Sequence, residues 1–427
     1  MKLRIYIIVN LLLFSLLSTQ KVYSCWGPWY APKDYHTFRI YEEDKQLYTE
    51  DEYGHPKLKS EVILNCELWQ KLIGEAIPVK DIYEAIYKST YEDILRIPQL
   101  IALPNATDSL MQNQFVKWVV GHKDREIAEF LLLAKLCEKI RWEQSSPWYY
   151  PTDNDHVSLT LTDVAVQAQA YAGKRLQDRY ALQAIRALFA TAQYDKCINY
   201  WNDMHDKLPD GLLKKMIRPY VAGAYFRTGA IEKAKQIYAE CGDVNSLLYC
   251  AGKQGKQTNE IEQMELVYKY CPNSPMLAQT AQRLIRFFEG MSNGWCEPSD
   301  RRWWASCLPL YEFSLKVALE GKTANPAMWY YTAAYIADKN GKVQKASDLL
   351  AMAERSKGDH FIKESVKVLR IYLDAKRLPC DASYEQKLFR QLQWLDKKIK
   401  ENSPYQAVND YFLKANISFN YWNDIRT

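Results

Sequence analysis

The stretch Lys215–Cys241, KMIRPYVAGAYFRTGAIEKAKQIYAEC, decides the fold of this chain. Apolar residues recur at spacings of three and four on both sides of Gly229, which is typical of two amphipathic helices joined by a glycine turn. Ala222 stands on the first helix and Ala234 on the second. Small residues at these points let two helix axes approach closely. The stretch therefore predicts an antiparallel helical hairpin.

This hairpin resembles the tetratricopeptide repeat, a helical hairpin of about 34 residues that stacks into solenoids. The matching positions are the large, small and large residues of the first helix, the turn glycine, and the small, aromatic and small residues of the second helix: Val221, Ala222, Tyr225, Gly229, Ala234, Tyr238 and Cys241. The resemblance implies that these side chains pack the hairpin and its neighbours together.

Two further segments fit the same pattern more loosely. From Asp178 the matching residues are Tyr194, Cys197, Trp201 and Pro209, whereas Ile185 and Ala192 depart from it. From Ala327 the matching residues are Tyr330, Ala334, Gly341, Ala346 and Ala353, whereas Ala337 and Leu350 stand where aromatic residues are usual. Tyr194 and Ile231 are expected to begin the second helices of two successive hairpins.

Helical periodicity extends over most of the chain outside these repeats. Arg125–Trp142 shows it most clearly, and prolines at 78 and 98 are expected to bound the helices over 81–88 and 91–97. A break rich in proline and aspartate, Ser145–Asp155, divides an N-terminal helical region, 60–155, from a tetratricopeptide-like region, 156–427. The predicted fold class is all-α, a right-handed solenoid of antiparallel helical hairpins.

The first 24 residues have the plan of a secretory signal peptide. Lys2 and Arg4 precede an apolar run, Ile5–Leu17, which is shorter than the about 20 residues that span a bilayer. Cys25 follows the expected cleavage site, and the residues before it are similar to the lipobox of bacterial lipoproteins. That resemblance implies a lipid anchor on Cys25; ordinary cleavage that leaves a cysteine first is the alternative. We expect an exported protein of the periplasm, outer membrane or cell surface.

The segment 25–59 is expected to be irregular and rich in aromatic residues, with a short strand possible over Tyr35–Tyr41. Loss of residues 1–24 would remove Lys2, Arg4 and Lys21 and no acid, so the formal charge of +5 would fall to +2. This near-neutral balance offers no electrostatic basis for binding nucleic acid. A membrane would be contacted only through the lipid anchor.

No motif in the sequence predicts catalysis, a metal ion or a cofactor. The six histidines are scattered and no H-E-x-x-H motif occurs. Gly290–Gly294 matches the G-x-S-x-G string of hydrolases, but a predicted helix precedes it where the nucleophile elbow needs a strand. We therefore interpret it as the end of a helix, and we expect the protein not to be an enzyme.

One loop combines the residue types of a binding surface. Trp295, Arg301, Arg302, Trp303 and Trp304 interrupt the helical rhythm, and rigid aromatic and arginine side chains are common in binding hot spots. Cys296 and Cys307 flank this loop and form a candidate disulfide, because the expected compartment is oxidising. Packing of an interrupted helix against its neighbours is the alternative interpretation of these rings.

The predicted function is that of a binding or scaffold protein whose concave surface takes up a protein or peptide partner, since helical solenoids commonly do so. A second hypothesis is glycan binding, because the SusD-like outer-membrane lipoproteins are similar in combining a lipidated cysteine, tetratricopeptide helices and exposed aromatic residues. A third is a hydrolase with a dispersed active site.

Overall fold

The computed structural model describes residues 38–40, 48–50, 56–74, 77–103, 108–145, 160–253, 258–294, 305–379 and 381–400. The chain divides into two compact units, one of Met1–Thr37 with Pro379–Thr427 and one of Phe38–Leu378. Within the first unit the structure describes one helix, α20 (Ala382–Lys400). Cys25 and the candidate signal peptide lie outside the described residues.

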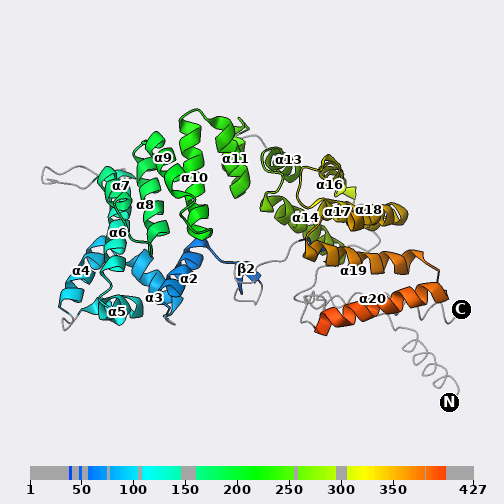
Figure 1. The fold of residues 1–427 in the computed structure, drawn as a ribbon, viewed down its shortest axis with the longest axis horizontal. Coiled ribbons are helices and arrows are strands. Elements are labelled where there is room, and N and C mark those ends of the chain that lie inside the picture. Colours follow the sequence, from blue (N-terminus) through cyan, green and yellow to red (C-terminus); the bar gives the residue numbers. More distant parts are fainter. Residues whose placement is uncertain are drawn as a thin grey trace, which may run out of the picture. The chain divides into compact units, whose positions relative to one another are not determined.

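The protein is all-α, as its periodicity predicts (Figure 1). The first part of the second unit holds α2 (Glu61–Ile73), α3 (Val79–Tyr83), η2 (Glu84–Lys88), α4 (Tyr91–Ala102), η3 (Ser109–Gln112), α5 (Gln114–Gly121), α6 (Arg125–Ser145), α7 (Leu161–Gln169), α8 (Gln177–Ala190) and α9 (Tyr194–Met204). It continues with α10 (Leu212–Arg227), α11 (Ile231–Cys241), α12 (Val244–Cys250), α13 (Glu260–Tyr270), α14 (Pro275–Gly294), α16 (Leu308–Glu320), α17 (Pro326–Lys339), α18 (Val343–Arg355) and α19 (His360–Arg377).

Neighbouring helices in the sequence pack on one another, which makes the array a helical solenoid. Contacts join α7 to α8, α8 to both α9 and α10, and α10 to α11. In the same way, α16 packs on α17, α17 on α18, and α18 on α19. A contact between helices distant in the sequence is also present among the described residues, because α2 packs against α10. That contact places the first long helix against the middle of the array.

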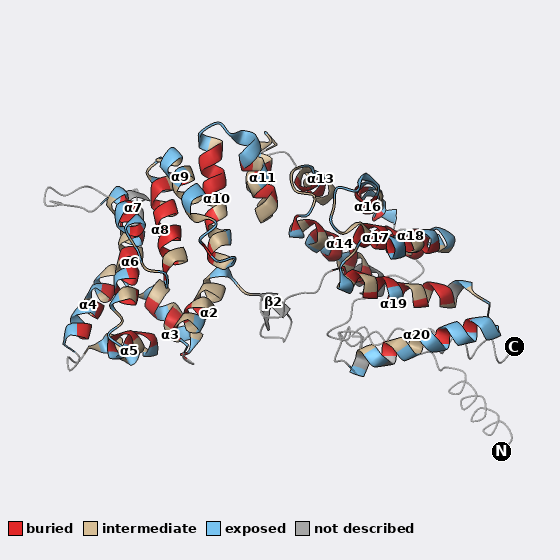
Figure 2. Cartoon of the chain, in the orientation of Figure 1, coloured by how far each residue is buried: buried red, intermediate tan, exposed pale blue. Residues whose placement is uncertain are grey.

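The hairpin of α10 and α11 contains the small residues expected at a close crossing. Ala222 and Ala234 are fully buried, Tyr225 and Tyr238 are nearly so, and Cys241 is half-buried. Figure 2 shows α8 and α10 buried along much of their length. Gly229 adopts a φ of +85° in the turn, a left-handed conformation that favours glycine.

The pair α17 and α18 has the same construction. Ala334, Ala346 and Ala353 are fully buried, and Gly341 in the intervening turn has a φ of +75°. Each glycine therefore ends one helix so that the next can return antiparallel to it.

Two local predictions were wrong. Pro98 does not end its helix, because α4 continues to Ala102 with the proline inside it. The ring stands close to the carboxyl end, where few further helical hydrogen bonds remain to be disturbed. The segment 25–59 is also not wholly irregular, since Tyr48–Glu50 (β1) and Pro56–Leu58 (β2) pair as antiparallel strands.

A short piece of that N-terminal segment lies in the core of the C-terminal helices. Phe38 and Ile40 are buried, with exposed fractions of 0% and 1%. The Phe38 ring contacts Tyr331 and Tyr335 of α17, and the backbone N–H of Ile40 donates to Oε1 of Gln282 in α14 at 2.9 Å. Phe38–Ile40 therefore fills a position among α14 and α17 that the helices alone leave unfilled.

None of the helices within the described residues combines the length and apolar character needed to cross a bilayer.

Candidate functional site

Most of the predicted binding loop falls in a part of the chain that the structure does not describe. Trp295, Cys296, Arg301, Arg302, Trp303 and Trp304 lie outside the described residues. Cys307 is described and is buried at the amino end of α16. Its pairing with Cys296, like the exposure of the tryptophans, stays a prediction.

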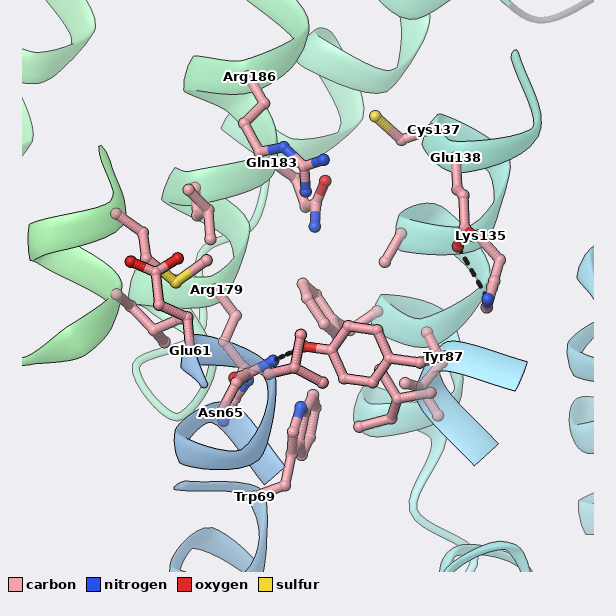
Figure 3. Close-up of a pocket in the computed structure, with 18 of the residues that line it drawn as sticks. Glu61, Asn65, Trp69, Tyr87, Lys135, Cys137, Glu138, Arg179, Gln183 and Arg186 are labelled. Carbon is pink, nitrogen blue, oxygen red and sulfur yellow. Dashed lines mark hydrogen bonds and ion pairs between the residues drawn. The ribbon is translucent and has the colours of Figure 1, made fainter. Parts of the chain in front are cut away.

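The structure contains a cavity that the sequence did not predict. Its volume is about 440 Å³, and its walls come from α2, η2, α4, α6, α8 and α10 (Figure 3). The lining is mostly apolar, with Phe130 of α6 and Leu213 and Met216 of α10 among the wall residues. Helices α2 and α10, which pack against each other, both contribute wall residues.

Helix α8 supplies the polar side of the cavity. Leu182, Gln183 and Arg186 come three, four and seven residues after Arg179, so all four share one face of the helix. Figure 3 shows Arg179, Gln183 and Arg186 projecting from α8 toward the cavity. The opposite faces of α8 are apolar and buried, which fixes the helix in the array and aims this stripe inward.

Arg179 is a buried cation held in a defined orientation. Only 5% of its surface is exposed, and its guanidinium carbon lies 3.7 Å from the centre of the Trp69 ring. One guanidinium nitrogen donates to Oδ1 of Asn65 at 2.9 Å, and Nδ2 of Asn65 donates to the Tyr87 hydroxyl at 2.7 Å. Burial lowers the pKa of Arg179 to about 10, which still leaves the group charged at neutral pH.

Two neighbouring polar groups on α8 have no hydrogen-bond partner among the described residues. Oε1 of Gln183 is buried and accepts no hydrogen bond, and Nε of Arg186 is buried and donates none. Buried polar atoms are satisfied in the large majority of cases, because leaving one unpaired costs about 1–3 kcal/mol. The polar stripe of α8 is therefore incomplete without a further group in the cavity.

The charges around the cavity do not cancel. Nζ of Lys135 contacts Oε2 of Glu138 at 2.8 Å, so these two lining residues neutralise each other. Glu61 also lines the cavity and is exposed at the amino end of α2. Neither Arg179 nor Arg186 forms an ion pair with a described residue. The lining thus carries three cations and two anions, with the two arginines unpaired.

Three polar groups in or beside the cavity wall keep their protons at neutral pH. A charged guanidinium cannot serve as a general base at neutral pH. Burial raises the pKa of the Tyr87 hydroxyl, so this group stays protonated. Burial likewise raises the pKa of the Cys66 thiol, beside Asn65 in the chain, to about 11. Among the described residues, no three histidine, cysteine or carboxylate side chains gather as a metal ion would require.

The G-x-S-x-G string lies on a helix. The backbone of 290–294 belongs to α14, which runs from Pro275 to Gly294. A nucleophile elbow requires a strand followed by a sharp turn, so this string does not form one.

The sequence does contain one indication of this cavity, which is the pattern of polar residues on α8. Polar residues at 179, 183 and 186 form one stripe on a helix whose other residues are mostly alanine, leucine, isoleucine and tyrosine. An arginine at a position that the apolar periodicity marks as buried indicates a paired charge or a binding site. Which helices face that stripe depends on contacts distant in sequence, and only the structure shows them.

Comparisons of the chain with models of protein families, with curated proteins and with solved structures found no match.

Proposed function

We propose that this protein is an exported helical-repeat binding protein that takes up a segment of a protein or peptide partner, with the cavity beside α8 as the binding site. The resemblance of the α10–α11 hairpin to the tetratricopeptide repeat supports the general role, since such arrays present surfaces to other proteins. The observation that carries the proposal is the polar stripe of Arg179, Gln183 and Arg186, in which Oε1 of Gln183 and Nε of Arg186 have no hydrogen-bond partner among the described residues.

The physical reason is that an incomplete polar stripe lowers the stability of the free protein. Groups of this kind persist where a bound ligand completes their hydrogen bonds, because binding then recovers the desolvation cost. A cavity of about 440 Å³ can hold one or two amino-acid side chains of an extended segment. The apolar wall formed by Phe130 and Met216 would shield that segment from water.

A peptide array tests this role. Purified protein would be screened against a library of short peptides, together with Met216→Trp, which fills the cavity from α10. The matched control is Val166→Trp, because Val166 is 60% exposed on α7 and does not line the cavity. We expect peptides that bind the wild-type protein and the control and lose binding to Met216→Trp.

Ala134→Phe fills the cavity from α6 instead. This second variant keeps the test valid if Met216→Trp fails to fold. Circular dichroism would confirm that each variant is helical. If both cavity-filling variants keep the peptide profile of the wild-type protein, the binding site lies elsewhere. A wild-type protein that binds no peptide would contradict the proposed function.

We also propose export and lipid anchoring at Cys25, on the basis of the signal-like residues 1–24 and the lipobox resemblance. Cys25→Ser should release the protein from membranes and block signal cleavage by the lipoprotein peptidase. Unchanged fractionation and processing would leave simple secretion as the better account.

A further inference from the structure

We infer that the cavity is an anion site in which Arg179 and Arg186 bind a carboxylate of the ligand. The inference rests on the proposed function in taking this cavity as the binding site, and it adds the chemical group that is recognised. Both arginines lie on the lining face of α8, two helical turns apart.

The first line of evidence is the uncompensated charge. A buried charge is normally paired, since desolvation of an isolated ion is costly. Arg179 is 95% buried and forms no ion pair with a carboxylate among the described residues, although the charge of the neighbouring Asp178 favours its charged form. Lys135, by contrast, has its counter-ion in Glu138. An anionic ligand would supply the partner that Arg179 lacks.

The second line is the preorganisation of the guanidinium. Trp69 supports one face of Arg179, and the chain of hydrogen bonds from Tyr87 through Asn65 holds one edge. The other N–H groups of Arg179 donate to no acceptor among the described residues. A planar guanidinium with a free edge matches the two oxygens of a carboxylate.

The balance of charge indicates the kind of anion. The lining residues Glu61, Lys135, Glu138, Arg179 and Arg186 sum to one positive charge. One monoanion neutralises that charge, whereas a phosphate dianion would leave an excess buried in a largely apolar space. A carboxylate on an apolar or weakly polar body therefore fits best. The carboxyl terminus of a peptide and the carboxylate of an acidic sugar are two sources of this group.

Calorimetric titration of the full-length protein would test the inference with three probes. These are a tripeptide with a free carboxyl terminus, the same tripeptide with an amidated terminus, and a glucuronate disaccharide. Inorganic phosphate would serve as the competing anion. We expect the free-acid tripeptide to bind at least about tenfold more tightly than its amide, a difference of about 1.4 kcal/mol.

Variants connect that difference to the two arginines. Arg186→Met keeps an unbranched apolar stem and removes the guanidinium charge, and Nε of Arg186 makes no hydrogen bond to a described residue that the change would break. It should lower the affinity for the free acid by at least about tenfold and leave the affinity for the amide unchanged. Arg186→Lys retains the charge without the planar fork, so its affinity for the free acid should lie between those of the wild-type protein and Arg186→Met.

The control is Arg175→Met, because Arg175 is paired with Asp124 at 2.6 Å and lies outside the cavity lining. Its affinities should equal those of the wild-type protein. Equal binding of acid and amide would overturn the carboxylate inference while leaving peptide binding intact. Binding of the glucuronate alone would support the anion site and contradict the peptide role. Tighter binding of phosphate, or no binding of any carboxylate probe, would also overturn the inference.

Discussion

The Phe38 ring lies stacked on the Tyr331 ring, with centroids 5.5 Å apart and an angle of 11° between the ring planes. The first residue stands ahead of the helical array and the second stands in α17, so the contact joins two distant parts of the chain. The neighbouring Arg39 places its guanidinium carbon 5.3 Å from the ring centre of Phe361 in α19. This segment therefore contributes to the core of the C-terminal helices.

Phe38→Ala should destabilise the protein by about 3–5 kcal/mol, because it removes a fully buried aromatic ring and leaves a cavity. Chemical denaturation of the wild-type and variant proteins would measure the loss. Phe389→Ala is the control, since that ring is 63% exposed, and its effect should be small. Equal effects of the two substitutions would show that Phe38 is not docked in solution.

Ala234→Leu should cost about 1–3 kcal/mol, because Ala234 is fully buried in α11 where this helix packs on α10. Thermal unfolding would detect the change. Ala190→Leu, at the exposed end of α8, adds the same atoms outside the core and should be nearly neutral. If Ala234→Leu has the same melting temperature as the wild-type protein, α10 and α11 are packed less closely at their crossing than the structure shows.

Gln183→Leu should stabilise the free protein by about 1 kcal/mol, since it replaces an amide whose buried oxygen has no partner with an apolar group of similar size. The urea midpoint would report the gain. Gln193→Leu is the control, because its amide is bonded to Thr191 and Lys196, and it should bring no gain. Destabilisation by Gln183→Leu would indicate that water satisfies this amide in the cavity.

Asp93→Asn should weaken the dependence of stability on acid pH. Hydrogen bonds from the backbone of Thr90, and then from its side chain, lower the pKa of Asp93 below its usual 3.8. The folded state therefore favours the carboxylate. That contribution is complete above the unfolded pKa and is lost as the pH falls from about 4 through the folded pKa.

Melting temperatures between pH 5 and pH 2 would measure this effect, with a smaller decline expected for Asp93→Asn than for the wild-type protein. The control is Asp203→Asn, an exposed position of α9 that makes no cap. Identical curves for wild type and Asp93→Asn would exclude the capping box of α4 as a source of acid sensitivity.

The helical fold could be predicted from local pattern because each helix pair carries its own periodicity and turn. Tyr194 and Ile231 begin α9 and α11 as expected, and the helix predicted over 125–142 is part of α6. The prediction that Pro98 ends its helix was wrong because proline is tolerated near the end of α4. The cavity was missed for a different reason. Asn65, Tyr87 and Arg179 lie far apart in the sequence, and no local pattern indicates that they meet.

The docking of Phe38–Ile40 has a consequence for the order of folding. A helical array with only local contacts can fold by adding each pair to the preceding one. Here the early segment must pair with α14 and α17, which are synthesised much later, so completion of this core requires closure of a long loop. Such non-local contacts slow folding. Phe38–Ile40 would therefore stay undocked until the C-terminal helices have been synthesised. Its docking would be among the last steps of folding.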